Sequence, residues 1–265
     1  MLVPFQRKIL PLTDVDKDEA LSAWFDSECG VTLRREVVAA VERILPDLFG
    51  YHLVTVGAHA GRELIASSRI SHQITIGAKA DGDDGIDLVS NHHALPVAEN
   101  AIDVLVLPFV LEFSDDPHQL LREAERVLIG EGHILIVSFN PWSLFGLWRL
   151  FLGWRDGVPW RGRFMPQSRI KDWLQLLGFD VRHASKIGFR PPLQRPGVNR
   201  RFEFMEQLGA FAWPIFGNAS VLVAKKRVAS VTPLKASWET RRRLLAGGGV
   251  VEPTTRNNRN SDKPL

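Results

Sequence analysis

Short apolar runs that alternate with amphipathic segments are the feature that most restricts the fold of this 265-residue chain. Four of these runs have the length and composition of buried strands, and they lie at 52–57, 73–77, 101–107 and 133–139. Strands that alternate with helices predict a parallel sheet with helices on both faces. The chain is therefore expected to have an α/β fold.

Helices are predicted from apolar periodicity and from residues typical of helix ends. Asp116 and Pro117 have the order of an N-cap and a first helical residue. Ser168 is expected to cap a later helix, which Gly178 ends. The expected helices are 32–45, 61–68, 117–128 and 168–177, and two further strands are expected at 179–183 and 219–225.

Charge and cysteine content exclude some classes of protein. The net charge is +3, and residues 229–265 hold seven Lys/Arg against three Asp/Glu, so the rest of the chain is not basic and nucleic acid is not an expected partner. The one cysteine, Cys29, permits no disulfide within a chain. Neither a signal peptide nor a membrane-spanning run is recognisable. We expect a cytoplasmic protein.

The segment from Leu95 to Trp142 carries a specific pattern. It contains Leu95-Pro96, Ile102-Asp103, Arg126-Val127-Leu128 and a glycine turn at Gly132, placed around two strands and a helix. This order resembles the middle of class I S-adenosylmethionine (SAM) dependent methyltransferases, and in particular a bacterial subgroup of methyltransferase type 11-like proteins. The resemblance implies a Rossmann-like fold, a mostly parallel sheet with an antiparallel last strand, and SAM as cofactor.

The resemblance extends over residues 30–228 and suggests how the chain is divided. Residues 1–50 are expected to form a helical segment that packs on the core, and 51–228 the methyltransferase domain. An aromatic and basic insertion occupies 141–165. The remaining residues, 229–265, are rich in glycine and polar residues and are expected to be disordered.

In this family the loop after the first strand grips the cofactor with the pattern Gly-x-Gly-x-Gly. The resemblance therefore implies that Gly57, Ala58, His59 and Gly61 contact SAM, although His59 replaces the middle glycine. Thr55 stands where an acidic residue is usual. A solvent-exposed position is the alternative for His59.

The second strand of family members ends in Asp or Glu, whose carboxylate accepts hydrogen bonds from both ribose hydroxyls. Here that position is Gly77. Asp81, Asp83 and Asp84 follow in the next loop, either as substitutes or as a solvated acidic turn.

The remaining cofactor contacts that the resemblance implies lie in two loops. Asn91 aligns with an Asp that bonds the adenine amino group, and its side-chain oxygen can accept the same bond. His92-His93 is not expected to bind a metal, because no further ligand stands at a suitable spacing. The implied contacts in these loops are His92, Ala94, Leu95, Pro108 and Phe109.

Three residues are candidates for acceptor binding: Glu112, Asn140 and Trp142. A structural role is the alternative for Glu112. The insertion has four tryptophans and four arginines between 142 and 163. One interpretation is a lid that packs on the sheet, and another is a segment that contacts a membrane surface or a hydrophobic substrate. Stacking on nucleic acid is the least favoured interpretation.

Methyl transfer is an in-line displacement that needs alignment and a dry pocket but no obligatory nucleophile or metal, so no catalytic residue is assigned. The sequence predicts SAM-dependent methylation of an unidentified small-molecule or lipid-like acceptor. The alternative is a methyltransferase-fold protein with a degenerate cofactor site that acts as a binding or regulatory module. A dinucleotide oxidoreductase is disfavoured, because the loop lacks the third glycine and the second strand lacks the acid.

Overall fold

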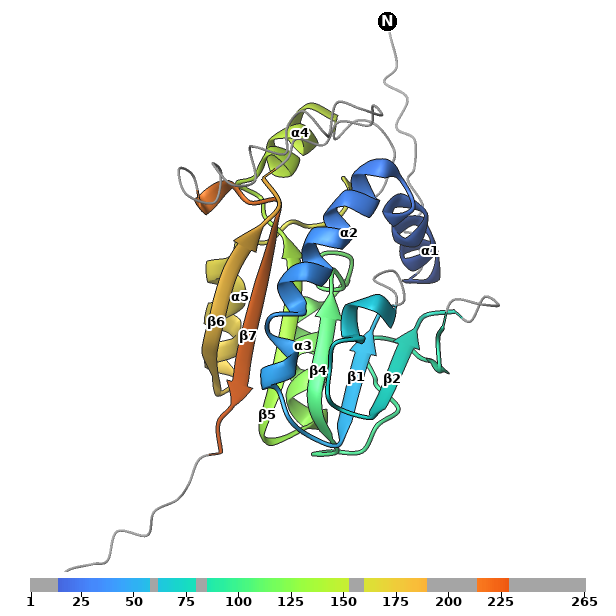
Figure 1. Cartoon of the computed structure of the whole chain (residues 1–265), viewed down its shortest axis with the longest axis vertical. Coiled ribbons are helices and arrows are strands. Elements are labelled where there is room, and N and C mark those ends of the chain that lie inside the picture. Colours follow the sequence, from blue (N-terminus) through green and yellow to red (C-terminus); the bar gives the residue numbers. More distant parts are fainter. Residues whose placement is uncertain (1–13, 58–61, 80–84, 153–159, 190–213, 229–265) are drawn as a thin grey trace, which may run out of the picture. The chain divides into compact units, whose positions relative to one another are not determined.

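Strands β1, β2, β3, β4 and β5 of the computed structural model run parallel in one sheet (Figure 1). The structure describes residues 14–57, 62–79, 85–152, 160–189 and 214–228. Within them the strand order is β3-β2-β1-β4-β5-β7-β6. The strands are β1 (His52–Val56), β2 (His72–Gly77), β3 (Leu88–Val89), β4 (Ile102–Pro108), β5 (Leu128–Phe139), β6 (Phe179–Ile187) and β7 (Ala219–Lys226).

The last strand, β7, is antiparallel to both of its neighbours, β5 and β6. This arrangement confirms the expected mostly parallel sheet with an antiparallel last strand. Because β1, β2, β4 and β5 are parallel, the loops that follow them meet at one edge of the sheet. We call this the carboxyl edge.

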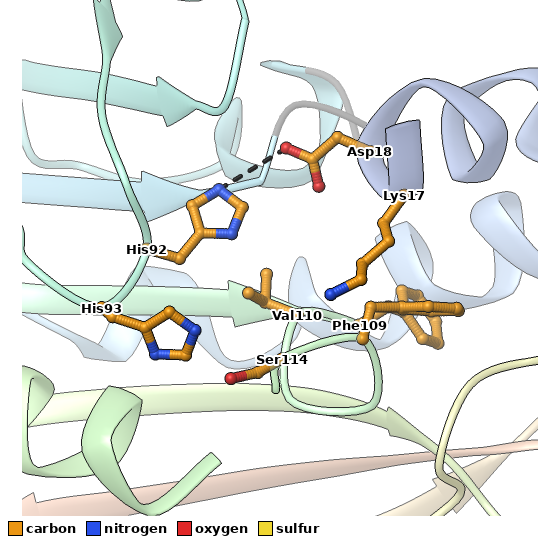
Figure 2. Close-up of a pocket in the computed structure, with 8 residues that line it drawn as sticks. Lys17, Asp18, His92, His93, Phe109, Val110 and Ser114 are labelled. Atoms are coloured by element: carbon orange, nitrogen blue, oxygen red, sulfur yellow. Dashed lines mark ion pairs between the residues drawn. The ribbon is translucent and has the colours of Figure 1, made fainter. Parts of the chain in front are cut away.

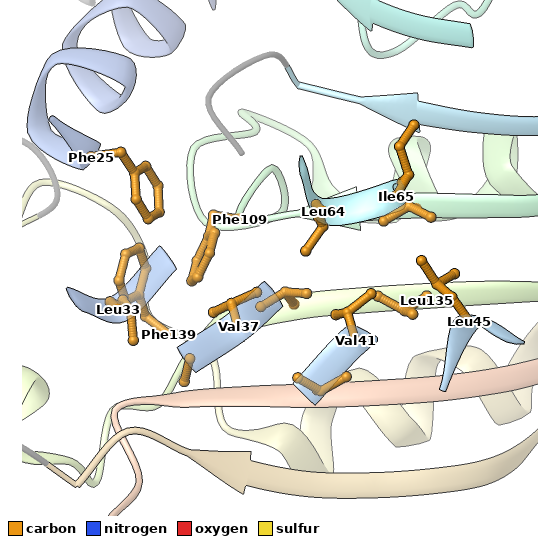
Figure 3. Packing of buried hydrophobic residues seen from close by; sticks show 14 of the residues in the cluster. Phe25, Leu33, Val37, Val41, Leu45, Leu64, Ile65, Phe109, Leu135 and Phe139 are labelled. Atoms are coloured by element: carbon orange, nitrogen blue, oxygen red, sulfur yellow. The ribbon is translucent and has the colours of Figure 1, made fainter. Parts of the chain in front are cut away.

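Helices cover both faces of the sheet, as expected (Figure 1). On one face α2 (Glu28–Val41) buries Leu33, Val37 and Val41 in a core that includes Phe139 of β5 (Figure 3). On the other face lie α3 (Pro117–Val127) and α5 (Gln167–Leu176), whose leucines pack with those of β4. The other helices are α1 (Asp14–Phe25), α4 (Leu144–Leu152) and the short η1 (Leu45–Asp47), η3 (Arg62–Ile65) and η4 (Pro214–Phe216).

Several predicted boundaries were wrong. The helix α2 begins at Glu28, because the Ser27 side chain accepts a hydrogen bond from the Gly30 amide and caps it earlier than expected. The predicted helix at 61–68 is reduced to η3, and β3 was missed because it has only two residues. Pro166, not Ser168, precedes the first turn of α5.

No separate helix was predicted for α1, although residues 1–50 were expected to be helical and to pack on the core. Its buried apolar residues, Leu21, Trp24 and Phe25, gather in its last turns and do not form a stripe along its length. Trp24 packs edge-to-face against Phe139 and Phe145. Packing of these residues on the core therefore stabilises the helix, and it places the first turns of α1 above the carboxyl edge.

Two hydrogen-bond networks give a structural reason for the sequence pattern between Leu95 and Trp142. The Asp103 carboxylate accepts hydrogen bonds from the Tyr51 and His52 amides at 3.0 and 2.9 Å, which joins β4 to the start of β1. The Arg126 guanidinium donates to the Glu123 carboxylate and to the Leu95 and Val97 carbonyls. The motif residues thus fasten α3 to the loop after β3.

The insertion lies partly on the core. Its Phe145, in α4, is buried and stacks against Phe139. Trp142 and Trp148 remain 66% and 39% exposed. Residues 153–159, which belong to the insertion, and the expected tail at 229–265 lie outside the described ranges.

Candidate functional site

The loop after β1 opens with a glycine in a conformation that other residues rarely adopt. Gly57 is buried, has φ of +98° and donates its amide hydrogen to the Ile76 carbonyl at 2.7 Å. Glycine has no Cβ and adopts positive φ without steric cost. Ala58, His59 and Gly61, the other predicted contacts of this loop, lie outside the described residues.

The end of β2 carries no acidic side chain. A Cβ placed on Gly77 would lie 2.6 Å from the Ile86 Cδ1 atom, so Ile86 fills the space into which an acid at this position would grow. Asp87 is committed elsewhere, because it accepts from the Thr75 amide at 2.8 Å and pairs with Arg62 at 2.6 Å. The predicted substitutes Asp81, Asp83 and Asp84 are outside the described residues.

The loop after β3 presents one buried histidine. His92 is 5% exposed, and its Nε2 atom lies 3.5 Å from an Asp18 carboxylate oxygen. Asn91 is exposed, and its side-chain oxygen already accepts the His93 amide hydrogen at 2.8 Å. That oxygen has a second lone pair for the predicted adenine bond. Ala94 is exposed, whereas Leu95 is buried and donates its amide to Glu123.

The loop after β4 places an aromatic ring beneath the carboxyl edge. Pro108 ends β4, and Phe109 has φ of +56°, which is uncommon for a bulky residue. The Phe109 ring is 1% exposed and packs against Phe25 of α1 and Phe139 of β5 (Figure 3). The strained backbone therefore turns this ring toward the core, between α1 and the sheet.

Two of the three predicted acceptor contacts have structural partners. One oxygen of Glu112, a side chain 1% exposed, accepts the Phe139 amide hydrogen. Burial raises the pKa of Glu112 to about 8, against the lowering effect of that hydrogen bond. The Asn140 side chain donates to the Ile215 and Gly217 carbonyls at 2.7 and 2.8 Å and holds η4 beside the end of β5.

A small cavity lies where these loops meet the first turns of α1 (Figure 2). Among the described residues its lining combines α1 with the loops after β3 and β4. The lining residues are Lys17, Asp18, His92, His93, Phe109, Val110, Phe113 and Ser114. Of the predicted site residues that the structure describes, only His92 and Phe109 line it, while Glu112, Asn140 and Trp142 do not.

The sequence did not reveal Lys17, Asp18, His93 or Ser114 as site residues. The two from α1 were missed with their helix. No pattern in the sequence marks Ser114, which is buried, and His93 was considered only as a metal ligand. The acidic and basic residues in 14–19 are the one available signal, and such charges more often mark a solvated helix face.

Within the part of the chain that the structure describes, three buried polar atoms of this cavity have no hydrogen-bond partner: His92 Nε2, His93 Nδ1 and Ser114 Oγ. Buried polar groups without partners cost free energy and are uncommon, so their concentration here is typical of a site that binds a polar ligand. These three atoms can form hydrogen bonds with the adenine nitrogens and ribose hydroxyls of SAM. Gly57 has no side chain, so a ligand can approach its backbone closely. The cavity itself measures only about 10 Å³, so α1 or the loops must shift to admit a ligand of that size.

The described residues contain no group of three His, Cys, Asp or Glu side chains that could hold a metal ion. None of the described helices is long and apolar enough to cross a bilayer. The small pocket at the carboxyl edge is lined by polar, charged and aromatic side chains.

Known proteins resemble this chain in sequence and in fold. The sequence profile of a family described as "Methyltransferase domain" matches residues 51–136. YafS, an uncharacterised protein of Escherichia coli (strain K12), is 31% identical over 220 residues, which cover 82% of this chain and 87% of that protein.

Solved structures share the fold at low sequence identity. A chain in the complex between the Haloferax volcanii Trm112 methyltransferase activator and a methyltransferase has a TM-score of 0.58 and 16% identity, covering 82% of this chain and 98% of that one. A SAM-dependent methyltransferase from Thermotoga maritima has a TM-score of 0.56 and 15% identity, with coverages of 79% and 98%. Another, from Archaeoglobus fulgidus, has a TM-score of 0.52 and 21% identity, with coverages of 73% and 94%. The domain match at residues 51–136 and the shared fold together identify a class I methyltransferase domain in this chain, and the match over most of its length shows that the chain and YafS belong to one family.

Proposed function

We propose that this chain transfers a methyl group from SAM to an acceptor with a substantial apolar part. The observation that supports it most directly is the small pocket at the carboxyl edge, where three buried polar atoms lack hydrogen-bond partners among the described residues. A degenerate pocket that no longer binds a ligand would gain stability by replacing those atoms with apolar ones. Their presence favours a site that still binds its cofactor.

SAM, when bound, supplies a methyl carbon that is already activated by the neighbouring sulfonium. The residues of this chain then have to bind, align and exclude water. His92, His93 and Ser114 provide hydrogen-bonding groups toward the cofactor, and Phe109 and Phe113 keep water out. Alignment of two reactants alone can lower a barrier by roughly 7–11 kcal/mol, so a site that only binds and aligns SAM and its acceptor can supply a large part of the rate enhancement.

The acceptor class is argued from the surface beside the pocket. Large apolar side chains are exposed in two segments at the carboxyl edge, and Asn140 ties these segments together. We call these residues the apolar rim: Trp142, Leu147, Trp148, Ile215 and Phe216. Exposed apolar patches in one region mark surfaces that bind apolar partners. The rim favours a lipid-like acceptor, with peripheral contact to a membrane surface through 142–163.

The rim is also connected to the pocket. The Arg163 amide donates to the Glu112 carbonyl at 2.8 Å, which joins the end of the insertion to the loop after β4. The same loop carries Phe109, Phe113 and Ser114 of the pocket lining. An acceptor that binds at the rim would therefore approach the pocket beside the loop after β4.

The test uses SAM labelled with tritium on its methyl group. The purified chain is incubated with the label and with a bacterial extract, which is then partitioned between organic and aqueous phases. We expect label in the organic phase, and a strong reduction for Gly57→Val, because a β-branched residue cannot adopt φ of +98° without strain. Label confined to the aqueous phase would contradict the apolar acceptor, and no transfer at all would contradict methyl transfer.

The alternative, a binding or regulatory module of the same fold, makes a different prediction. Such a protein either binds no SAM or binds it without transferring the methyl group. Calorimetry with S-adenosylhomocysteine, the demethylated product, separates these cases, since it measures binding without an acceptor.

A further inference from the structure

The first turns of α1 place a carboxylate between the loops that follow β2 and β3. The Asp18 Oδ2 atom accepts a hydrogen bond from the Ala78 amide at 3.2 Å and lies 3.5 Å from His92 Nε2 (Figure 2). Only 16% of the Asp18 side chain is exposed. The carboxylate is therefore held one residue beyond the end of β2, within the wall of the pocket.

The end of β2 itself cannot provide this group. Gly77 has no side chain, and Ile86 occupies the space beside it. The structure describes one other acid in the neighbouring segment, Asp87. Both of its carboxylate oxygens already accept hydrogen bonds, one from the Thr75 amide and one from the Arg62 side chain. Asp18, in contrast, reaches the backbone amide of Ala78, one residue beyond the end of β2, and also lines the pocket.

We propose that Asp18 binds the ribose of SAM in place of an acid at the end of β2. This inference rests on the proposed function. A carboxylate only accepts hydrogen bonds, and the two ribose hydroxyls are donors, so the chemistries are complementary. Hydrogen bonds to a charged acceptor are about twice as strong as neutral ones.

The present contacts of Asp18 are compatible with an exchange of partners. The carboxylate accepts a hydrogen bond from the Ala78 amide and lies 3.5 Å from His92 Nε2, in the wall of a cavity of about 10 Å³. Drug-sized ligands occupy pockets of roughly 300 Å³ or more, so SAM enters only after α1 or the neighbouring loops shift. When α1 and the loops return to their positions, the Asp18 carboxylate accepts hydrogen bonds from the ribose, so α1 forms one wall of the cofactor site.

The test measures binding of S-adenosylhomocysteine to the full chain by calorimetry, without any acceptor. Asp18→Asn is expected to weaken binding about ten- to a hundredfold, the range for a lost hydrogen bond to a charged group. Glu19→Gln is the matched control, because it removes the same charge from the neighbouring, exposed position of α1. It is expected to change the dissociation constant less than about twofold.

A second ligand keeps the test independent of folding effects. The wild-type chain is expected to bind the 2′-deoxy analogue of S-adenosylhomocysteine more weakly than the parent compound, whereas Asp18→Asn is expected to discriminate little between them, because its contact is already lost. A purely structural role for Asp18 would leave the discrimination intact.

The outcomes separate this inference from the proposed function. If wild type binds and Asp18→Asn binds equally well or more tightly, the assignment of Asp18 is overturned while SAM binding stands. If wild type does not bind S-adenosylhomocysteine at all, both proposals fall.

Discussion

Glu112 is a fully buried carboxyl group whose second oxygen, Oε2, has no hydrogen-bond partner. Burial raises its pKa from an ordinary value of 4.5 to about 8. The folded state therefore binds a proton that the unfolded state has released at any pH between these values. The free energy of unfolding then falls as pH rises from 4.5 to about 8, by up to about 1.4 kcal/mol per pH unit.

Glu112→Gln should remove this part of the pH dependence, because the amide oxygen still accepts the Phe139 amide hydrogen and no longer titrates. Denaturant unfolding at pH 5, 6, 7 and 8 measures the difference between the variant and wild type. The control is Glu99→Gln, which changes an exposed carboxyl group. Parallel curves for wild type and Glu112→Gln would show that Glu112 carries no buried proton.

Arg126 joins α3 to the loop after β3 through hydrogen bonds to two carbonyls and to Glu123. Arg126→Met should lower the free energy of unfolding by roughly 1–3 kcal/mol, because it leaves the largely buried Glu123 carboxylate without its cationic partner. Chemical denaturation checks this. Arg122→Met, on the same helix but exposed, should have a much smaller effect. Equal losses for both variants would contradict the scaffold role of Arg126.

At the scale of single residues, the sequence indicated the scaffold better than the site. Asp103 and Arg126 contribute to a recognisable pattern because each fastens segments whose spacing in the chain is fixed by the fold. Asp18 could not be predicted, because its contact with Ala78 spans 60 residues and depends on where α1 docks.

Among the elements, α1 is the part of the structure that covers the pocket. Its first turns are joined to the start of α3 by Lys17, which pairs with Asp115 at 2.8 Å. Asp115 is 81% exposed, so the pair contributes no more than about 1 kcal/mol. If α1 must open before a ligand enters, this pair slows the opening.

Lys17→Met should therefore raise the limiting rate of S-adenosylhomocysteine binding by up to about fivefold. Stopped-flow measurements should show an observed rate that levels off at high ligand concentration, which is typical of a step that precedes binding. The matched control, Lys225→Met, breaks a pair with Glu131 on β5 and β7, away from the pocket. A rate that increases linearly with concentration in every variant would rule out a gating role for α1.

Except for the exposed two-residue β3, the strands of the sheet were predictable, because each apolar run carries its signal locally. The helix over the pocket was not, because only Leu21, Trp24 and Phe25 of α1 are buried in the core and they lie together near its end. The predicted helix at 61–68 is observed as the short η3, which buries Leu64 and Ile65. Apolar periodicity does not predict elements whose form depends on tertiary contacts.

On the scale of the whole molecule, the apolar rim and the pocket lie at the same edge of the sheet. This arrangement suits an acceptor taken from an apolar phase. We predict that the chain co-sediments with vesicles of anionic phospholipid at low salt, and that Trp142→Ser combined with Trp148→Ser reduces the bound fraction severalfold. The control pair, Phe49→Ser with Tyr51→Ser, removes exposed aromatic side chains near the start of β1. No pelleting of the wild-type chain would count against membrane contact.

The central claim is that the carboxyl edge, closed by α1, binds SAM. Calorimetric titration of the full chain with S-adenosylhomocysteine tests it most directly, because the measurement needs neither an acceptor nor turnover. The account predicts saturable binding at one site per chain with a micromolar dissociation constant. The absence of any heat of binding at millimolar ligand, from a chain that unfolds cooperatively, would contradict it.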